Sequence, residues 1–446
     1  MDPVGVIKAG DSVILKRGND LKLMKIFRNR NIFLSKRNFS IDPAIGKPYG
    51  TVWDVVDRTI KQVESEQKEQ ESEGSSGGHD NRSLVDDGRS QRLTRDDIVA
   101  MKSQGVQGQE LVEQIVEHST TFKSKTVFSQ AKYLKKKKNK HLLRFRILRP
   151  SIRLLCDAYM LKGPSKNLYI RMDTMSQILT QGNIQAGLNV LLVETCQGLL
   201  LSAVVERMAG HGKLVQIHSE DIPVRQAFDS YNFPEEYKKV IHSFPMNQVA
   251  SIFQEEVEEC KMDEEVSVSK KQRLEGEPEC SAPSLAERNE PSEEGDEKAD
   301  SEQMVCDEKD VPSEDQSCEN VKQTQMAIDQ ERKLKKKLLL NEARSILKAK
   351  NMDVLLIASK FQPEPLLMTL IDLVLPSRQV VVYSPFREAL VECYTKLRKH
   401  GGVVNISITE TWLREYQVLP DRTHPMMTMN ASGGFLLTGT TVTLDH

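Results

Sequence analysis

Residues 188–221 read LNVLLVETCQGLLLSAVVERMAGHGKLVQIHSED, and this stretch decides the fold. A run of β-forming residues at 190–193 leads into the short turn ETCQG at 194–198. An apolar helix follows and ends at Gly210, and a second short strand covers 214–217. Strand, turn, helix and strand within about 30 residues form the βαβ unit that opens a doubly wound nucleotide-binding sheet.

The turn of such a unit normally holds the ligand, because glycines let the backbone approach closely and the helix N-terminus directs amides at it. Here a single glycine, Gly198, remains. A ribose-binding carboxylate is expected about 20 residues further on. The sequence has His218 and Ser219 there, before Glu220 and Asp221. Since one glycine is a weak motif, the pattern favours an ordinary buried βαβ unit over a working cofactor loop.

Length and composition bound the class of protein. A chain of 446 residues allows two or three domains. The chain shows neither a basic-then-apolar leader nor an uninterrupted apolar run of about 18 residues, so we expect a soluble, unsecreted protein without a membrane partner. Seven scattered cysteines form no CxxC pair, which argues against a zinc site or a disulfide framework and fits a reducing compartment.

The formal net charge of −2 hides a division along the chain. Residues 255–330 carry 25 acidic and 8 basic residues, whereas the remainder carries 39 acidic and 54 basic residues. The acidic segment is poor in aromatic residues, so we predict a disordered insertion. The parts expected to fold are basic, which suits a polyanionic partner.

The N-terminal segment predicts a small β domain. Short β-forming runs within residues 10–57 are separated by turn residues at 18–20 and 29–31, which indicates a barrel or sandwich. Residues 61–80 contain too few apolar residues to form a core, and we expect them to be a flexible linker. After the linker we predict a helix for which Thr94 is the N-cap and Asp97 is the capping-box partner.

A basic tract, KYLKKKKNKHLLRFRILRPS, covers residues 132–151. Lysines and arginines at this density release counterions from a phosphate backbone, and the interleaved aromatic rings of Tyr133 and Phe145 can stack on unpaired bases. A solvated helix face and a nuclear-localisation signal are the alternative interpretations. The interleaved aromatic residues favour nucleic-acid contact.

The second half of the chain repeats the α/β pattern. Residues 151–187 predict a strand-loop and a helix, and a basic helix is expected over 327–350. Strands and helices then alternate to the C-terminus, so one sheet interrupted by the acidic insertion is more economical than two domains. The predicted domains are a β domain at 1–60, a linker at 61–80, a helical and basic connector at 81–150, the first half of the sheet domain at 151–252, the disordered acidic insertion at 253–330 and the second half at 331–446.

Several long strings carry a specific resemblance. The chain resembles the non-catalytic subunit of the tRNA (adenine-N1)-methyltransferase that acts on the T-loop adenosine at position 58. The matching strings are NRSLVDDGRSQRLT (81–94), HSTTF (118–122), KYLKKKKNK (132–140), LTQGNIQAG (179–187), ETCQG (194–198), ECYTKLRKHGGVVN (392–405) and ETWLREYQVLPDRTHP (410–425).

The resemblance implies an α/β fold in which a small β-barrel-like domain precedes a degenerate Rossmann-like methyltransferase sheet. It implies a heterotetramer with two catalytic and two non-catalytic subunits, located in the nucleus. The catalytic copy has a glycine-rich turn after its first strand and an aspartate after its fourth. This chain has ETCQG and Ala358-Ser359 at those positions. We therefore expect no catalytic residue, no bound cofactor and no metal here, with S-adenosylmethionine used by the partner.

The expected role is to bind tRNA and to scaffold the catalytic subunit. One alternative is a divergent active methyltransferase that holds S-adenosylmethionine through Glu194, Gly198 and Glu220. Another is an RNA-binding scaffold similar to a translation factor. The resemblance implies tRNA contacts at Arg82, Arg89, Ser90, Gln91, Lys132, Tyr133, Lys135, Lys136, Lys137, Lys138 and Lys140, and at Lys360, Arg414, Tyr416 and Arg422.

Overall fold

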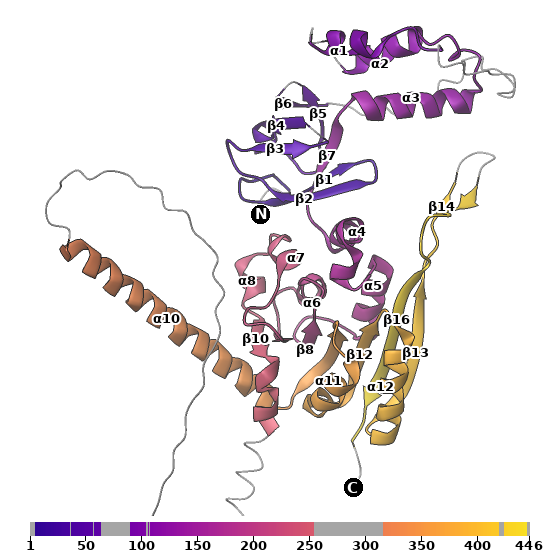
Figure 1. Cartoon of the computed structure of the whole chain (residues 1–446). Helices are drawn as coiled ribbons and strands as arrows, with labels where there is room; N and C mark the ends of the chain where they lie inside the picture. Colours follow the sequence, from indigo (N-terminus) through magenta and orange to yellow (C-terminus); the bar gives the residue numbers. More distant parts are fainter. Residues whose placement is uncertain are drawn as a thin grey trace, which may run out of the picture. The chain divides into compact units, whose positions relative to one another are not determined.

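A computed structural model describes residues 5–35, 37–56, 58–63, 90–103, 106, 108–253, 315–418 and 423–443 (Figure 1). The chain forms two compact units. One comprises Met1–Met246 together with Ile346–His446, and the other comprises Asn247–Ser345.

The N-terminal part is an antiparallel sheet with the strand order β2-β1-β7-β5-β6. A separate hairpin, formed by β3 and β4, supplies further side chains to the same core. The core side chains include Leu15, Phe39, Trp53 and Phe145, and the Trp53 Nε1 donates to Thr51 Oγ1 at 2.8 Å. The strands are β1 (Ser12–Arg17), β2 (Asp20–Lys25), β3 (Asn31–Leu34), β4 (Arg37–Ser40), β5 (Val52–Val56), β6 (Thr59–Gln62) and β7 (Arg144–Leu148).

The central strand of this sheet, β7, lies outside the range 1–60 that we predicted for the β domain. Its residues alternate strictly, with Phe145 and Ile147 buried in the core and Arg144 and Arg146 on the outer face. Because this period of two buries one face, the segment belongs in the sheet. From the sequence we predicted instead that its arginines belong to the basic connector at 81–150.

Three helices precede β7: α1 (Arg95–Ser103), α2 (Gly108–Glu117) and α3 (Val127–His141). The capping box expected at α1 is confirmed, since Thr94 N donates to Asp97 Oδ2 at 2.9 Å and Asp97 N donates to Thr94 Oγ1 at 3.2 Å. Helix α3 begins at the cap residue Thr126 and carries the lysine tract. The predicted linker at 61–80 lies outside the described residues from 64 onward.

The large sheet has the strand order β10-β9-β8-β11-β12-β16-β13. The first five strands run parallel, and β16 runs antiparallel to both β12 and β13. Leu355 of β11 pairs with Leu191 of β8, so strands from both sides of the acidic segment lie next to each other. The single Rossmann-like sheet expected from sequence is therefore confirmed. Its strands are β8 (Asn189–Glu194), β9 (Lys213–His218), β10 (Ile241–Pro245), β11 (Met352–Ala358), β12 (Val374–Ser384), β13 (Val403–Trp412) and β16 (Ser432–Thr441).

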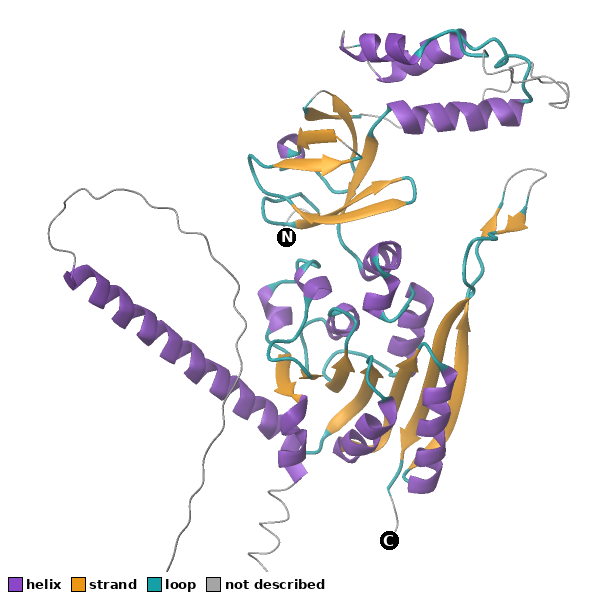
Figure 2. Ribbon diagram, viewed as in Figure 1, coloured by secondary structure: helices purple, strands orange, loops and turns teal. Residues whose placement is uncertain are grey.

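Helices flank this sheet on its two faces (Figure 2). Helices α4 (Ile152–Lys162), α5 (Met172–Gln181) and α6 (Leu199–Met208) share a buried apolar cluster with β8, β11 and β12. Helices α11 (Pro363–Leu370) and α12 (Arg387–His400) pack on β11, β12, β13 and β16. The prediction of a strand-loop after residue 151 is wrong, because Ser151 caps α4 by accepting from Leu154 N.

The unit 247–345 contains most of helix α10 (Asp315–Lys348), in which Arg344 Nη2 donates to Gln248 Oε1 at 3.2 Å. This helix begins at Asp315, within the range 253–330 that we predicted for the insertion. Residues 254–314 lie outside the described part of the chain. Within the described residues, no helix is long and apolar enough to cross a membrane.

Candidate functional site

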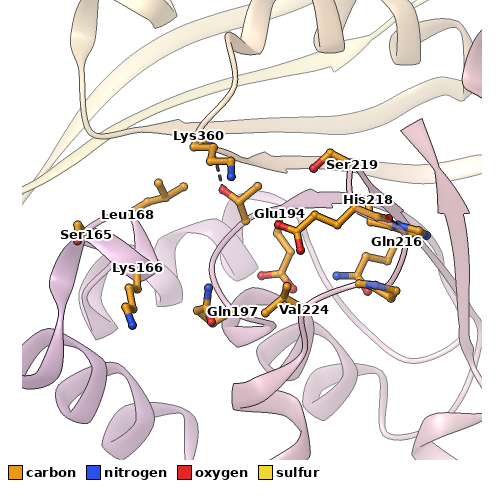
Figure 3. Close-up of a pocket in the computed structure, with 13 residues that line it drawn as sticks. Ser165, Lys166, Leu168, Glu194, Gln197, Gln216, His218, Ser219, Val224 and Lys360 are labelled. Atoms are coloured by element: carbon orange, nitrogen blue, oxygen red, sulfur yellow. Dashed lines mark hydrogen bonds between the residues drawn. The ribbon is translucent and has the colours of Figure 1, made fainter. Parts of the chain in front are cut away.

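A cavity of about 180 Å³ opens where β8, β9 and β11 end, at the carboxyl edge where parallel α/β sheets bind ligands (Figure 3). This volume is below the roughly 300–1,000 Å³ typical of small-molecule sites. The cavity is lined by Ser165, Lys166, Leu168, Glu194, Thr195, Gln197, Gln216, His218, Ser219, Glu220, Pro223, Val224 and Lys360.

The first amides of helix α6 are engaged by the chain's own carboxylate. The two Glu194 oxygens accept from Leu200 N and Leu201 N, each at 3.2 Å. Burial raises the pKa of Glu194 to about 7, and the two amides and the nearby Arg225 oppose this rise. An internal acid therefore stands where a helix N-terminus would otherwise meet a ligand's negative group.

Gly198 has a φ of +79°, and the backbone of Arg225 lies directly over it. Ala227 N donates to Gln197 O at 2.9 Å, which ties this second segment to the turn. The Arg225 guanidinium donates to Gln216 Oε1 and to Ser243 Oγ, both at 2.7 Å. The space that a glycine clears is therefore filled by the protein's own backbone.

The end of β11 has no carboxylate. Ala358 O accepts from Thr195 N at 3.0 Å and from Cys196 Sγ at 3.4 Å, and Lys360 N donates to Thr195 Oγ1 at 2.8 Å. These bonds fasten the turn to the end of β11, which offers no carboxylate as a proton acceptor.

Two of the three residues considered for holding S-adenosylmethionine are engaged within the protein. Among those considered for a divergent enzyme, Glu194 is committed to helix α6 and Gly198 to the approach of Arg225. The carbonyl of Glu220 is hydrogen-bonded to the His218 ring. In the part of the chain that the structure describes, no group of His, Cys, Asp and Glu could hold a metal ion.

The lysine tract lies on helix α3, where the helical period divides it into two faces. Lys132, Lys135, Lys136 and Lys140 are exposed and recur at spacings of three, four and eight residues, so they form one stripe, named here the α3 lysine stripe. Lys137 and Lys138 are half-buried and lie off this stripe.

Tyr133 packs within the protein. Its ring centroid lies 5.6 Å from that of Phe122. The ammonium groups of Lys125 and Lys137 lie 4.9 Å and 5.2 Å from the same ring. Its hydroxyl donates to Gln91 Oε1 at 3.4 Å. The structure thus gives Tyr133 a packing role where sequence indicated base stacking.

Two more of the predicted contact residues lie beside this helix. Ser90 O accepts from Thr120 N at 2.9 Å, and Gln91 pairs with Ser119 in an isolated bridge. Together with the tyrosine contact, these bonds bring the predicted residues of 90–91 and 132–140 into one region.

The remaining predicted contact residues are elsewhere. Lys360 lines the sheet-end cavity, whereas Arg414 and Tyr416 follow the end of β13, where β14 (Tyr416–Gln417) pairs with β15 (His424–Pro425). Tyr416 is exposed and therefore does not belong to the core. Arg82, Arg89 and Arg422 lie outside the described residues.

Sequence reasoning missed a second hollow, of about 420 Å³, beside the N-terminal sheet. Its basic side chains are Lys16, Arg17, Lys138, Arg144 and Arg146. The alternation of arginine with buried apolar residues in RFRIL, at 144–148, was the available signal for this surface.

A family model and individual relatives both match this chain, and they agree with each other. The family model described as the Gcd10p family matches residues 6–278. The chain is 40% identical over 455 residues to the mouse protein named tRNA (adenine(58)-N(1))-methyltransferase non-catalytic subunit TRM6, covering 98% of this chain and 89% of that protein. It is 31% identical to the Dictyostelium discoideum protein of the same name, covering 98% and 80%.

Among solved structures, the tRNA (m1A58) methyltransferase TrmI of Aquifex aeolicus aligns with a TM-score of 0.44 at 11% identity, covering 99% of this chain and 100% of that one. The family model covers more than half of the chain, and the mouse relative matches nearly all of it. The chain therefore belongs to the Gcd10p family, together with the non-catalytic methyltransferase subunits of mouse and Dictyostelium.

Proposed function

We propose that this chain is the non-catalytic, tRNA-binding subunit of a heteromeric tRNA methyltransferase that forms N1-methyladenosine at position 58. It scaffolds a catalytic subunit in a heterotetramer with two copies of each chain. S-adenosylmethionine binds to the partner and not to this chain. The names of the mouse and Dictyostelium relatives support this proposal.

One observation carries the non-catalytic role: the backbone of Arg225 lies over Gly198, the single glycine of the turn. Glu194 engages the first amides of helix α6, and the fourth strand ends in Ala358 and Ser359. The turn is therefore not prepared for a methyl donor, and the end of β11 offers no carboxylate that could accept a proton from adenine. Both functions must come from another polypeptide.

The tRNA-binding role follows from the chemistry of the reaction. Methylation of N1 requires that this atom be unpaired, so the T-loop must be opened while the rest of the tRNA is held. Holding a folded RNA depends on phosphate and sugar contacts, which recognise shape. The α3 lysine stripe offers four exposed ammonium groups on a rigid helix for this purpose.

The proposed contacts extend beyond that stripe to the other residues implied by the resemblance. Lys137 and Lys138 add charge next to it, while Tyr133, Ser90 and Gln91 hold the surrounding segment in place. Outside this region the proposal includes Arg82, Arg89, Lys360, Arg414, Tyr416 and Arg422.

The decisive experiment measures transfer of labelled methyl groups from S-adenosylmethionine to tRNA. It uses this chain alone, the co-purified partner alone and the two together. Activity only in the mixture is expected. Activity of this chain alone would contradict the non-catalytic role, and the absence of any methyltransferase among co-purified proteins would favour the RNA-binding scaffold.

We further propose that the complex works in the nucleus. The basic runs KKKK at 135–138 and KLKKK at 333–337 support this location. Imaging of a fluorescently tagged chain tests it, and a signal excluded from the nucleus would contradict it.

A further inference from the structure

Residues 27–33 of the N-terminal domain expose two aromatic and two arginine side chains outside the contacts proposed above. Phe27, Arg28, Arg30 and Phe33 are all exposed, and these four residues are named here the N-terminal aromatic patch. Phe27 is 42% exposed and Phe33 is 61% exposed. The surrounding segment, residues 25–37, contains five basic residues and no acidic residue. Aromatic rings combined with positive charge are typical of surfaces that bind single-stranded nucleic acid.

The loop between β2 and β3 is held at both ends. Ile26 and Ile32, which flank it, are buried in the core of the domain. Ile26 N donates to Asp11 O at 2.9 Å, and Asn29 N donates to the two Asp42 carboxylate oxygens at 3.1 Å and 3.2 Å. Asn29 has a φ of +57°, a left-handed conformation that asparagine adopts more readily than most residues. The exposed side chains of this loop therefore stand on an ordered turn.

One arginine of the patch packs against one of its rings. The guanidinium carbon of Arg30 lies over the Phe27 ring, 5.5 Å from its centroid. A cation in this place is attracted to the negative face of the ring, so the pair restrains both side chains. The Asp42 carboxylate of the same turn accepts from Asn29 N and from Ser40 Oγ, the latter at 2.9 Å. The pair thus offers an aromatic ring and a set of N–H donors at one place.

Phe33 lies on the outer face of the β3–β4 hairpin. It pairs with Asn38, whereas the adjacent pair of Ile32 and Phe39 is buried in the core. Because side chains alternate along a strand, the Phe33 ring is directed away from that core. Lys22 Nζ donates to Phe33 O, which fixes the hairpin to β2. The second ring of the patch is therefore presented by a fixed strand.

The mixture of rings and arginines decides which occupant fits the patch. An apolar protein surface would cover the rings but would also remove water from the guanidinium groups, which costs free energy. An unpaired nucleotide suits both, since its base stacks on an aromatic ring and its phosphate accepts from a guanidinium. At most about 20 Å of chain separates residues 27 and 33, so one short RNA strand can reach both rings.

We propose that the N-terminal aromatic patch binds unpaired nucleotides of tRNA, with bases on Phe27 and Phe33 and phosphates on Arg28 and Arg30. This inference rests on the proposed function and extends it to the N-terminal domain, as a contact separate from the α3 lysine stripe. Opening the T-loop unstacks bases, and the patch replaces part of the stacking that they lose. Every base has a π-face, so the patch reads no sequence.

The first test separates stacking from charge in the assembled complex. Phe27→Leu/Phe33→Leu retains apolar bulk and charge, so we expect tRNA affinity to fall at least about tenfold while the slope of log affinity against log salt stays unchanged. Arg28→Gln/Arg30→Gln should instead reduce that slope by about 1.4, which corresponds to two phosphates of a single strand. Unchanged tRNA affinity in both variants would overturn the proposal.

The controls remove an exposed ring or two exposed charges outside the patch. Phe386→Leu changes an exposed phenylalanine that follows β12, and Lys8→Gln/Lys47→Gln removes two positive charges from the N-terminal domain. The controls should keep tRNA affinity within about threefold of wild type. All four variants should unfold within about 2 °C of wild type, since each replaced side chain is exposed. If Phe386→Leu weakens binding as much as the patch leucines do, the proposal is wrong.

A photo-crosslinking residue, p-benzoylphenylalanine at position 33, gives a readout independent of affinity. Upon irradiation of the complex with tRNA, cross-links to unpaired nucleotides are expected, and primer extension locates them. Cross-links to the catalytic subunit in place of tRNA would overturn the proposal, because the patch would then be a protein interface.

Failure of this inference is distinguishable from failure of the proposed function. If replacing the α3 lysine stripe weakens tRNA binding while neither patch variant does, the chain still binds tRNA and only the N-terminal aromatic patch is excluded. If the complex binds tRNA no more tightly than the catalytic partner alone, the proposed function itself is wrong.

Discussion

Arg225 lies so close over Gly198 that a Cβ added to this glycine would stand 2.9 Å from the Arg225 Cα. The glycine at the first turn of the sheet thus serves an internal contact. The sequence retains a residue typical of a cofactor loop, while the structure uses it to close that loop.

Replacing Gly198 with alanine should destabilise the protein by about 3 kcal/mol, because the positive φ and the contact with backbone add together. Gly187→Ala is the control, since Gly187 has a φ of +87° but nothing within 4 Å of the added Cβ. Its substitution should cost only about 1 kcal/mol. Urea denaturation measures the free energy of unfolding of both variants. Equal losses would show that the contact with Arg225 adds nothing to the destabilisation.

Glu194 predicts a pH dependence of stability. Its pKa rises from 4.5 to about 7 on folding, so the native state holds a proton that the unfolded state releases between these values. Stability should therefore fall as pH rises from about 4.5 to 7, by about 3 kcal/mol in total. Glu194→Gln should remove this component. Denaturation curves at pH 5 and 7.5 provide the check, and identical pH profiles for both proteins would disprove it.

The α3 lysine stripe predicts a loss of RNA affinity. Changing Lys132, Lys135, Lys136 and Lys140 to alanine should weaken tRNA binding and reduce the salt slope by about 0.7 to 0.9 for each phosphate that the protein no longer neutralises. The control changes the four exposed lysines of α10, at 333 and 335–337, and so removes the same charge. If both variants lower tRNA affinity and the salt slope equally, the α3 lysine stripe contributes only general electrostatic attraction.

Tyr133 should act through packing. Tyr133→Leu retains apolar contact with Phe122 but removes aromatic stacking, so affinity for tRNA should remain within about threefold of wild type. Tyr133→Ala should lower the free energy of unfolding by about 2 kcal/mol, below the range for fully buried aromatic residues because the ring is half-buried. If the leucine variant loses affinity by tenfold or more, the ring stacks on a base after all.

The parts of the fold predicted correctly from sequence depend on local patterns. The βαβ unit at 188–221 has two apolar strands and a continuous apolar helix, and the structure contains them as β8, β9 and α6. The helix ends at Met208, two residues before the predicted stop at Gly210. Helix α4 was missed because a short apolar run is ambiguous between strand and helix. Strand β7 was missed because its outward arginines merged with the lysines before it.

The candidate sites depend on contacts that no local pattern contains. The proximity of Arg225 to Gly198 and the pairing of Lys16 with Arg146 each join distant segments, so they follow from tertiary register. The proximity of Tyr133 to Lys125 and Lys137 follows from the helix period together with the fold of the preceding loop. Sequence indicated the charge of these regions correctly, but not which face each side chain occupies.

The pairing of Leu191 with Leu355 bears on how this protein tolerates change. The entropy of closing a long chain segment grows only with the logarithm of its length, so doubling or halving it shifts stability by about 0.6 kcal/mol. The segment between β10 and β11 is therefore free to lengthen, shorten or acquire new charge during evolution. The same pairing joins residues far apart in sequence, so assembly of the central sheet is expected to be slow.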